Sequence, residues 1–151
     1  AGTVQSESYE IEINKFYPAI KVVQQACPMW VPLIENNEYD KPGADYFIQQ
    51  HLNRLFQQSP DIDTLLLACT HYPLLIEKIR QFSPEGTTIL SQGSIVAESL
   101  KAYLQRHSDM EARCSKNGTR TFFTTDSIFD FDNHASIFFG EKLSSRHLEL
   151  L

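Results

Sequence analysis

The chain alternates between stretches in which apolar residues recur every three to four positions and short runs of consecutive apolar residues. Recurrence every three to four positions is typical of an amphipathic helix. It predicts helices over residues 6–16, 42–58, 74–82, 93–105 and 129–140. Ser6 is the expected N-cap of the first helix, and Pro42 stands at the first residue of the second, where helices favour proline.

Short apolar or β-branched runs predict strands over residues 19–23, 62–68, 87–90 and 120–124. The run over 62–68 is almost wholly apolar at its C-terminal end, which is typical of a strand that helices cover on both faces. Two prolines make 27–35 an irregular segment. Residues 36–41 and 106–118 are expected to be polar loops, and the tail after Lys142 is expected to be loose. Strands that alternate with helices predict an α/β fold with a parallel sheet.

Composition and charge narrow the classes of protein. The 151 residues are 42% hydrophobic and 21% charged, which fits one folded domain and excludes disordered, collagen-like and coiled-coil chains. The longest apolar run, Leu65–Cys69, is far shorter than the ~20 residues that span a bilayer, so no membrane partner is expected. The net charge of −6 has the wrong sign for general nucleic-acid binding. No signal-peptide pattern occurs, and a start inside Gly-Thr-Val without Met leads us to expect a fragment.

The three cysteines are Cys27, Cys69 and Cys114. Their number is odd and no two of them form a Cys-x-x-Cys pair, so neither a disulfide framework nor a zinc ribbon is indicated. We therefore expect a reducing, cytoplasmic location. A metal site is not expected, because the Cys69-x-His71 spacing alone is not that of zinc ligands.

The segment Cys69-Thr70-His71 lies between the most strand-like run and a predicted helix. Ligands of open α/β sheets bind beyond the carboxyl ends of the strands, where backbone N–H groups and a helix dipole favour a thiolate. Thr70 offers a hydroxyl and an N–H to a ligand carboxylate, and His71 can hold or relay a proton near neutral pH. These residues alone leave three interpretations open: a buried cysteine beside a loop histidine, a Cys–His nucleophile pair, or a thiol acid–base site.

A longer match surrounds this segment. Residues 67–75 resemble the Leu-Gly-Cys-Thr-His-Tyr-Pro-Leu-Leu signature around the second catalytic cysteine of bacterial glutamate racemases, with Ala68 in place of the usual glycine. The segments at 2–9 and 26–35 and the run that begins at Ile62 resemble further segments of that family. The similarity extends from Ala1 to about Phe139.

The resemblance implies a cofactor-independent racemase that interconverts L- and D-glutamate and supplies D-glutamate for peptidoglycan. In that family two cysteines act on opposite faces of the substrate α-carbon, one removing a proton and the other delivering one. The catalytic residues would be Cys69, His71 and Glu35, the acidic neighbour of this half of the site. Thr70, His71 and Thr3 would bind the substrate.

The resemblance also implies that this chain is a C-terminal portion and carries only half of the site. The other catalytic cysteine belongs to an N-terminal lobe that the chain lacks, and Cys27 matches a non-catalytic position. Residues 1–92 would form a three-layer lobe, with a mainly parallel sheet flanked by helices, in a two-lobe pseudo-symmetric enzyme. Residues 93–151 would pack on the absent lobe. We expect the isolated chain to be inactive and to associate, as a homodimer or with the N-terminal lobe.

Two other functions stay open at this point. A racemase or decarboxylase of the same superfamily would act on another acid such as aspartate, and a non-catalytic interaction module would use none of these residues.

The acidic residues Asp126, Asp130 and Asp132 are expected to form a solvated turn rather than a metal site. Trp30 is expected to lie in the core.

Overall fold

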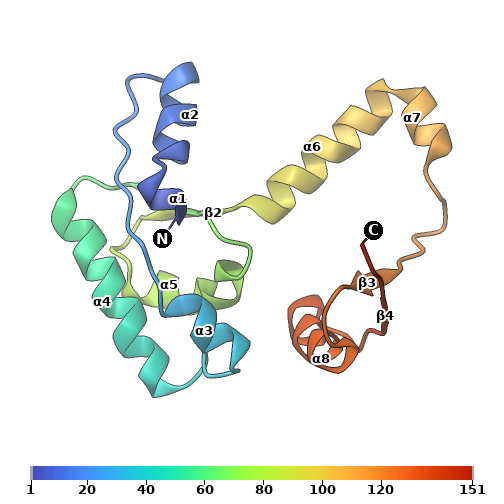
Figure 1. Ribbon diagram of the computed structural model, residues 1–151. Coiled ribbons are helices and arrows are strands. Elements are labelled where there is room, and N and C mark those ends of the chain that lie inside the picture. The colour runs from blue at the N-terminus through green and yellow to red at the C-terminus, as the bar shows by residue number, and fades with distance from the viewer. Residues whose placement is uncertain (1, 151) are drawn as a thin grey trace. The chain divides into compact units, whose positions relative to one another are not determined.

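The computed structural model describes residues 2–150, so that Ala1 and Leu151, the outermost positions of the two predicted domains, lie outside the described range. The chain forms two compact units that divide between Ile95 and Val96, inside helix α6 (Gln92–Arg106) (Figure 1). Whether these units are the predicted lobe and its return segment stays a prediction. Each unit is described below by itself.

The first unit is built around a pair of parallel strands. Its elements are α1 (Gly2–Gln5), α2 (Ser8–Phe16), α3 (Trp30–Glu35), α4 (Pro42–Gln58), β1 (Thr64–Leu67), η1 (Tyr72–Leu75), α5 (Ile76–Phe82) and β2 (Thr88–Ser91). Strands β1 and β2 pair in register from Thr64 opposite Thr88 to Leu67 opposite Ser91. The predicted α/β class, with parallel strands flanked by helices, is confirmed.

The core of this unit lies on one face of the strand pair. Leu65 and Leu67 of β1 are buried together with apolar residues of α3, α4, η1 and α5. Leu66 points the other way and is 39% exposed, and its register partner Leu90 is 38% exposed. The buried cluster includes Leu65 and Leu67 but not Leu66, so the second face of β1 is less buried than its apolar sequence predicts.

Two predictions in the N-terminal part of this unit are wrong. The helix predicted over 6–16 is present as α2 from Ser8, but Ser6 is not its N-cap: Glu7, with a left-handed φ of 51°, takes that position, and the Ser6 hydroxyl donates to the Thr3 carbonyl. Residues 19–23 form a turn and an irregular segment instead of a strand. A strand needs a neighbour for its backbone hydrogen bonds, and β1 and β2 pair only with each other.

The segment 27–35, predicted to be irregular, contains helix α3. Pro32 is the third residue of that helix. The first N–H groups of a helix have no partner within it, so a proline there removes no hydrogen bond. By contrast, α4 begins at Pro42 as predicted.

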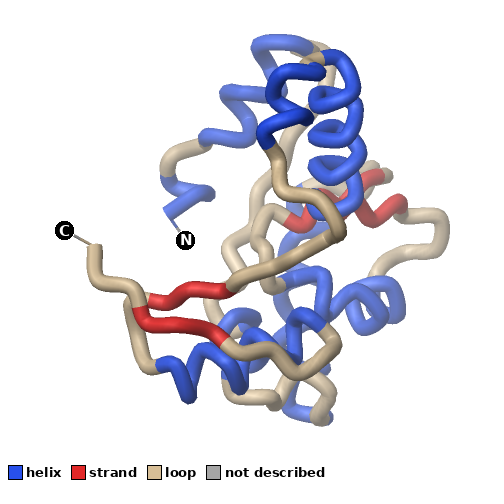
Figure 2. Tube along the Cα trace, turned by 90° about the vertical axis from the view of Figure 1, so that its right-hand side faces the viewer, coloured by secondary structure: helices blue, strands red, loops and turns tan. Residues whose placement is uncertain are grey.

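The second unit contains α7 (Ser108–Arg113), β3 (Phe122–Thr124), α8 (Ile128–Phe139) and β4 (Ser145–His147). Strands β3 and β4 pair in parallel, and Figure 2 shows them side by side. Helix α7 lies in the predicted polar loop and β4 lies in the tail predicted to be loose, so both predictions are wrong. Pairing with β3, together with burial of Leu143 and Ser145, orders the tail.

Candidate functional site

The turn after β1 carries the predicted cysteine. β1 ends at Leu67, and Cys69, Thr70 and His71 lead into η1, with the Tyr72 N–H donating to the Cys69 carbonyl at 3.2 Å. The Cys69 side chain is half-buried and Thr70 is exposed. Because the strands are parallel, this turn lies at the carboxyl edge of the pair, where ligands of α/β sheets bind.

The His71 imidazole links an acidic group to the thiol. Its Nε2 lies 3.3 Å from Oε1 of Glu35, the last residue of α3. Its Nδ1 lies 3.9 Å from Cys69 Sγ and 3.5 Å from Thr70 Oγ1. If the Glu35 carboxylate accepts from Nε2–H, then Nδ1 faces the thiol as the basic nitrogen of the neutral ring or as a donor of the imidazolium. This arrangement can hold a proton beside Cys69.

The structure thus brings four of the five predicted site residues together: Glu35, Cys69, Thr70 and His71. Thr3 is exposed on α1 and, within the described part of the chain, makes no side-chain hydrogen bond to these four. Helix α2 does reach the same sheet edge, because the Gln92 amide donates to the Tyr9 hydroxyl directly after β2. Thr3 stays a prediction.

The other two cysteines lie away from this arrangement. Cys27 belongs to the buried core, and burial raises the pKa of its thiol to about 12. That thiol stays protonated near neutral pH, in agreement with a structural position. Cys114 is exposed, and its Sγ donates to the Met110 carbonyl at 3.4 Å.

Tyr72 is a neighbour of the site that the sequence interpretation did not single out. Its ring packs edge-on against Trp30, with centroids 4.8 Å apart, and its hydroxyl donates to the Cys27 carbonyl at 3.5 Å. Burial, followed by the nearby Cys27 and Cys69 thiols, raises the pKa of Tyr72. The available signal was its place directly after His71 in the quoted motif. Trp30, expected in the core, is buried.

His51 of α4 packs on Trp30, and we expect it to make the stability of the first unit depend on pH. It is 3% exposed, and burial, followed by the charge of Arg54, lowers its pKa below the ordinary 6.5. The unfolded chain therefore binds the proton more tightly than the folded chain. The free energy of unfolding should fall as pH decreases from about 7 towards 5, by at most ~1.4 kcal/mol per pH unit, the limit for one proton. Urea titrations across this range measure it.

A matched pair of variants tests this assignment. His51→Leu should remove that part of the pH dependence, whereas His134→Leu, at an exposed position of α8, should retain it. Equal slopes for His51→Leu and the unchanged chain would contradict it.

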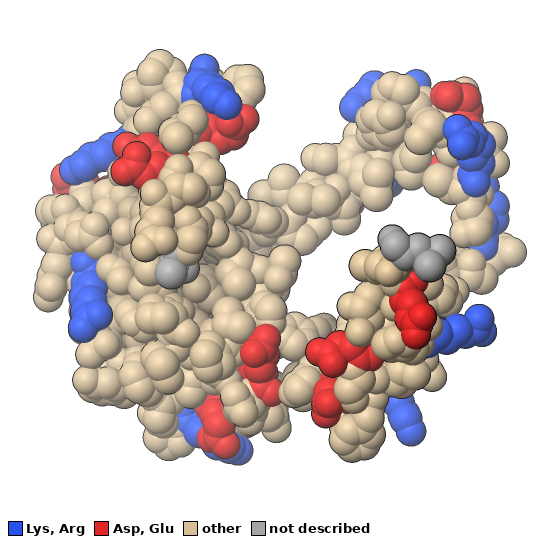
Figure 3. Space-filling view, in the orientation of Figure 1, with Lys and Arg blue, Asp and Glu red and all other residues tan. Residues whose placement is uncertain are grey.

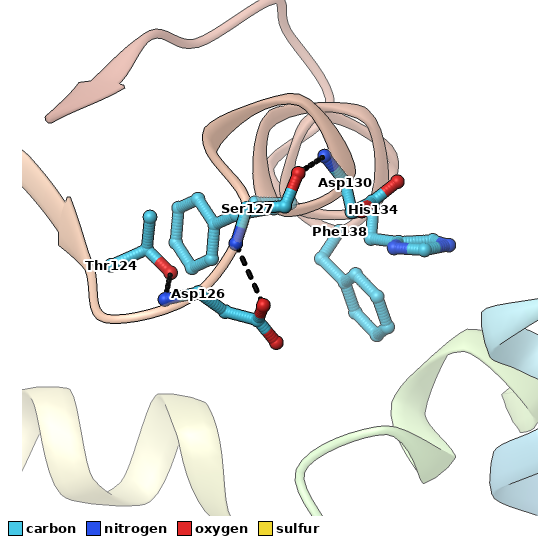
Figure 4. A pocket seen from close by; sticks show the side chains of 8 residues that line it. Thr124, Asp126, Ser127, Asp130, His134 and Phe138 are labelled. Atoms are coloured by element: carbon cyan, nitrogen blue, oxygen red, sulfur yellow. Dashed lines mark hydrogen bonds between the residues drawn. The ribbon is translucent and has the colours of Figure 1, made fainter. Parts of the chain in front are cut away.

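A second feature lies in the second unit, at the start of α8. A hollow of about 280 Å³ is lined by Thr124, Asp126, Ser127, Asp130, Phe131, His134, Ala135 and Phe138. The carboxylate of Asp126 accepts from the Ser127 N–H, and the Ser127 hydroxyl accepts from the Asp130 N–H (Figure 4). Asp132 accepts from the Ser145 N–H. These contacts link the turn before α8, the helix itself and β4 to one another. No group of metal-ligating side chains occurs among residues 2–150.

Charge and hydropathy give two further observations. On the face in Figure 3, Lys and Arg side chains lie scattered among Asp and Glu and do not gather into one basic patch. Within the described range, no helix combines the length and the apolar character that crossing a membrane requires.

Comparison with known proteins finds glutamate racemases. Over 150 residues, 99% of this chain, it is 33% identical to the glutamate racemase of Lactiplantibacillus plantarum. The crystal structure of a glutamate racemase isoform from Bacillus anthracis matches 99% of the chain with a TM-score of 0.83 and 32% identity. The chain is homologous to about half of a glutamate racemase. The resemblance named from the motifs is thereby confirmed.

The match covers only part of each relative. The chain spans about half the length of the curated relatives it matches, 54% for the L. plantarum glutamate racemase, and 55% of the B. anthracis structure. The glutamate racemase of Francisella tularensis, solved in complex with D-glutamate, matches with a TM-score of 0.78 at 24% identity, which supports the fold alone. No protein-family model matches the chain.

Proposed function

We propose that this chain is one half of a cofactor-independent glutamate racemase in which Cys69 exchanges a proton with one face of the substrate α-carbon. The observation that carries the proposal is the contact series from Glu35 through His71 to Cys69 at the carboxyl edge of β1. The glutamate racemases of L. plantarum and B. anthracis each match 99% of the chain. The reaction would supply D-glutamate for peptidoglycan, in the cytoplasm.

The proposed reaction requires two thiols. One thiolate takes the α-proton and becomes a thiol, leaving the electron pair on the α-carbon, and a second thiol on the opposite face donates a proton and becomes a thiolate. A single base can return a proton only to the face it came from. Cys69 serves one face, and the other thiol comes from the half of the protein that this chain does not contain. His71 holds a proton at Nδ1 beside Cys69, and Thr70, with Thr3, binds the substrate.

The apolar surface supports a partner for residues 93–151. Exposed apolar side chains occur on α6, on β3 and on α8, including Leu100, Phe123 and Phe129, which is 73% exposed. Exposed apolar surface of this kind favours association. We propose that the absent N-terminal lobe covers this surface and that the isolated chain is inactive and self-associates. Size-exclusion chromatography with light scattering tests this, and a stable monomer would contradict it.

The proposed activity is tested with the complete protein in D₂O. L-glutamate should lose its α-proton signal in NMR spectra while its circular dichroism falls to zero, and D-glutamate should behave in the same way. L- and D-aspartate serve as the comparison substrates. Exchange with aspartate alone would assign the chain to another reaction of the superfamily, and exchange with neither acid would contradict the proposal.

Glu35→Gln should weaken the reaction through His71. The amide keeps the size of the side chain but loses the charge that faces Nε2 at 3.3 Å. We expect kcat to fall about 10- to 100-fold, at or below the lower end of the range for groups that transfer the proton themselves. Glu38→Gln, exposed in the loop after α3, is the matched control and should leave kcat unchanged. Equal effects of the two variants would remove Glu35 from the site.

A further inference from the structure

Both ends of helix α3 contact the residues that follow Cys69. Its last residue, Glu35, lies 3.3 Å from His71 Nε2. Its first residue, Trp30, packs edge-on against Tyr72, with ring centroids 4.8 Å apart and an interplanar angle of 65°. His71 and Tyr72 are consecutive, so the two ends of one short helix contact neighbouring residues of the turn.

Further contacts hold Trp30 and Tyr72 in place. The Tyr72 hydroxyl and the backbone N–H of Trp30 both donate to the Cys27 carbonyl, at 3.5 and 3.2 Å. The Trp30 indole is 3% exposed and packs on the His51 ring at 6.0 Å. Six residues are too few for a helix to be stable by itself, so the position of α3 depends on these tertiary contacts.

We infer that Tyr72 is a positioning residue that holds the first turn of α3 against the Cys69 turn and thereby sets where Glu35 meets His71. The inference rests on the proposed function. The His71 ring contacts Glu35 at 3.3 Å and Cys69 at 3.9 Å, at the long end of hydrogen-bond distances. A small displacement of α3 would lengthen the contact between Glu35 and His71 Nε2 and change the setting of the ring beside Sγ. Displacements of about 1 Å can lower rates about 100-fold.

Two substitutions of Tyr72 in the complete protein separate its hydroxyl from its ring. Tyr72→Phe keeps the edge-on packing and loses the hydrogen bond to Cys27, so kcat should fall about 2- to 5-fold. Tyr72→Leu loses both contacts, so kcat should fall about 10- to 100-fold, with a much smaller change in KM. Tyr46 is the matched control, because it packs edge-on against Phe47 on α4 and its hydroxyl accepts from Gln50. Tyr46→Phe and Tyr46→Leu should leave kcat unchanged.

A double variant tests whether Tyr72 acts through Glu35. If it does, Tyr72→Leu combined with Glu35→Gln lowers kcat by clearly less than the product of the two single effects, because one contact cannot be lost twice. Effects that multiply would overturn the inference. A pure loss of folded protein would also multiply with the effect of Glu35→Gln.

A readout without substrate separates this inference from the proposed function. In a Cys114→Ser background, iodoacetamide alkylation of Cys69 is followed by mass spectrometry from pH 5 to 10; Cys27 is buried. Tyr72→Leu and Glu35→Gln should move the pH of half-maximal alkylation in the same direction, and Tyr46→Leu should not move it. An unchanged profile for Tyr72→Leu would overturn the inference. Failure of the wild-type protein to racemise glutamate would overturn only the proposed function.

Discussion

Replacing Cys69 with alanine in the complete protein should lower kcat for glutamate racemisation by about 10³- to 10⁴-fold in both directions, the range for a group that transfers the reacting proton. The methyl group can neither accept the α-proton nor deliver one. Racemisation in either direction uses both faces of the α-carbon, so loss of the thiol on one face stops both directions. The polarimetric rate from L- and from D-glutamate measures this effect.

The other two cysteines supply the controls. Cys114→Ala, at an exposed position, should leave kcat unchanged. Cys27→Ala should lower stability, because it opens space in the buried core, but should retain kcat per folded molecule. Racemisation that persists in Cys69→Ala, or an equal loss in Cys114→Ala, would remove Cys69 from the reaction.

Replacing Ile79 with alanine should produce a large loss of stability in the first unit. Ile79 is fully buried on α5 within the cluster that includes Leu65 and Leu67. Removal of its outer carbons loses apolar burial and leaves a cavity, so the free energy of unfolding should fall by about 2–5 kcal/mol. Urea unfolding followed by fluorescence reports on this core directly, because Trp30 is the single tryptophan of the chain.

An exposed isoleucine provides the comparison for this substitution. Ile11 on α2 is 52% exposed, and Ile11→Ala should change the free energy of unfolding by no more than ~0.5 kcal/mol. Equal losses at Ile79 and Ile11 would mean that the buried cluster is not the stabilising core.

Local signals account for the elements that were predicted correctly. A continuous apolar stripe after Pro42 specifies α4, and consecutive apolar residues specify β1. Two predictions were wrong because a distant partner decides the outcome. Ser145–His147 is a strand because Phe122–Thr124 lies beside it, and residues 19–23 are irregular because β1 and β2 pair only with each other.

The sequence alone determined the helices with a strong apolar stripe, the β1 strand, and the place of Cys69, Thr70 and His71 at its carboxyl end. These depend on residues within one turn or one strand of each other. Only the tertiary structure decided that Glu35, 36 positions before His71, contacts its ring, and that Tyr72 reaches the Cys27 carbonyl 45 positions away. Such contacts form because burial of the shared core brings α3 onto the turn, and spacing along the chain carries no information about that distance.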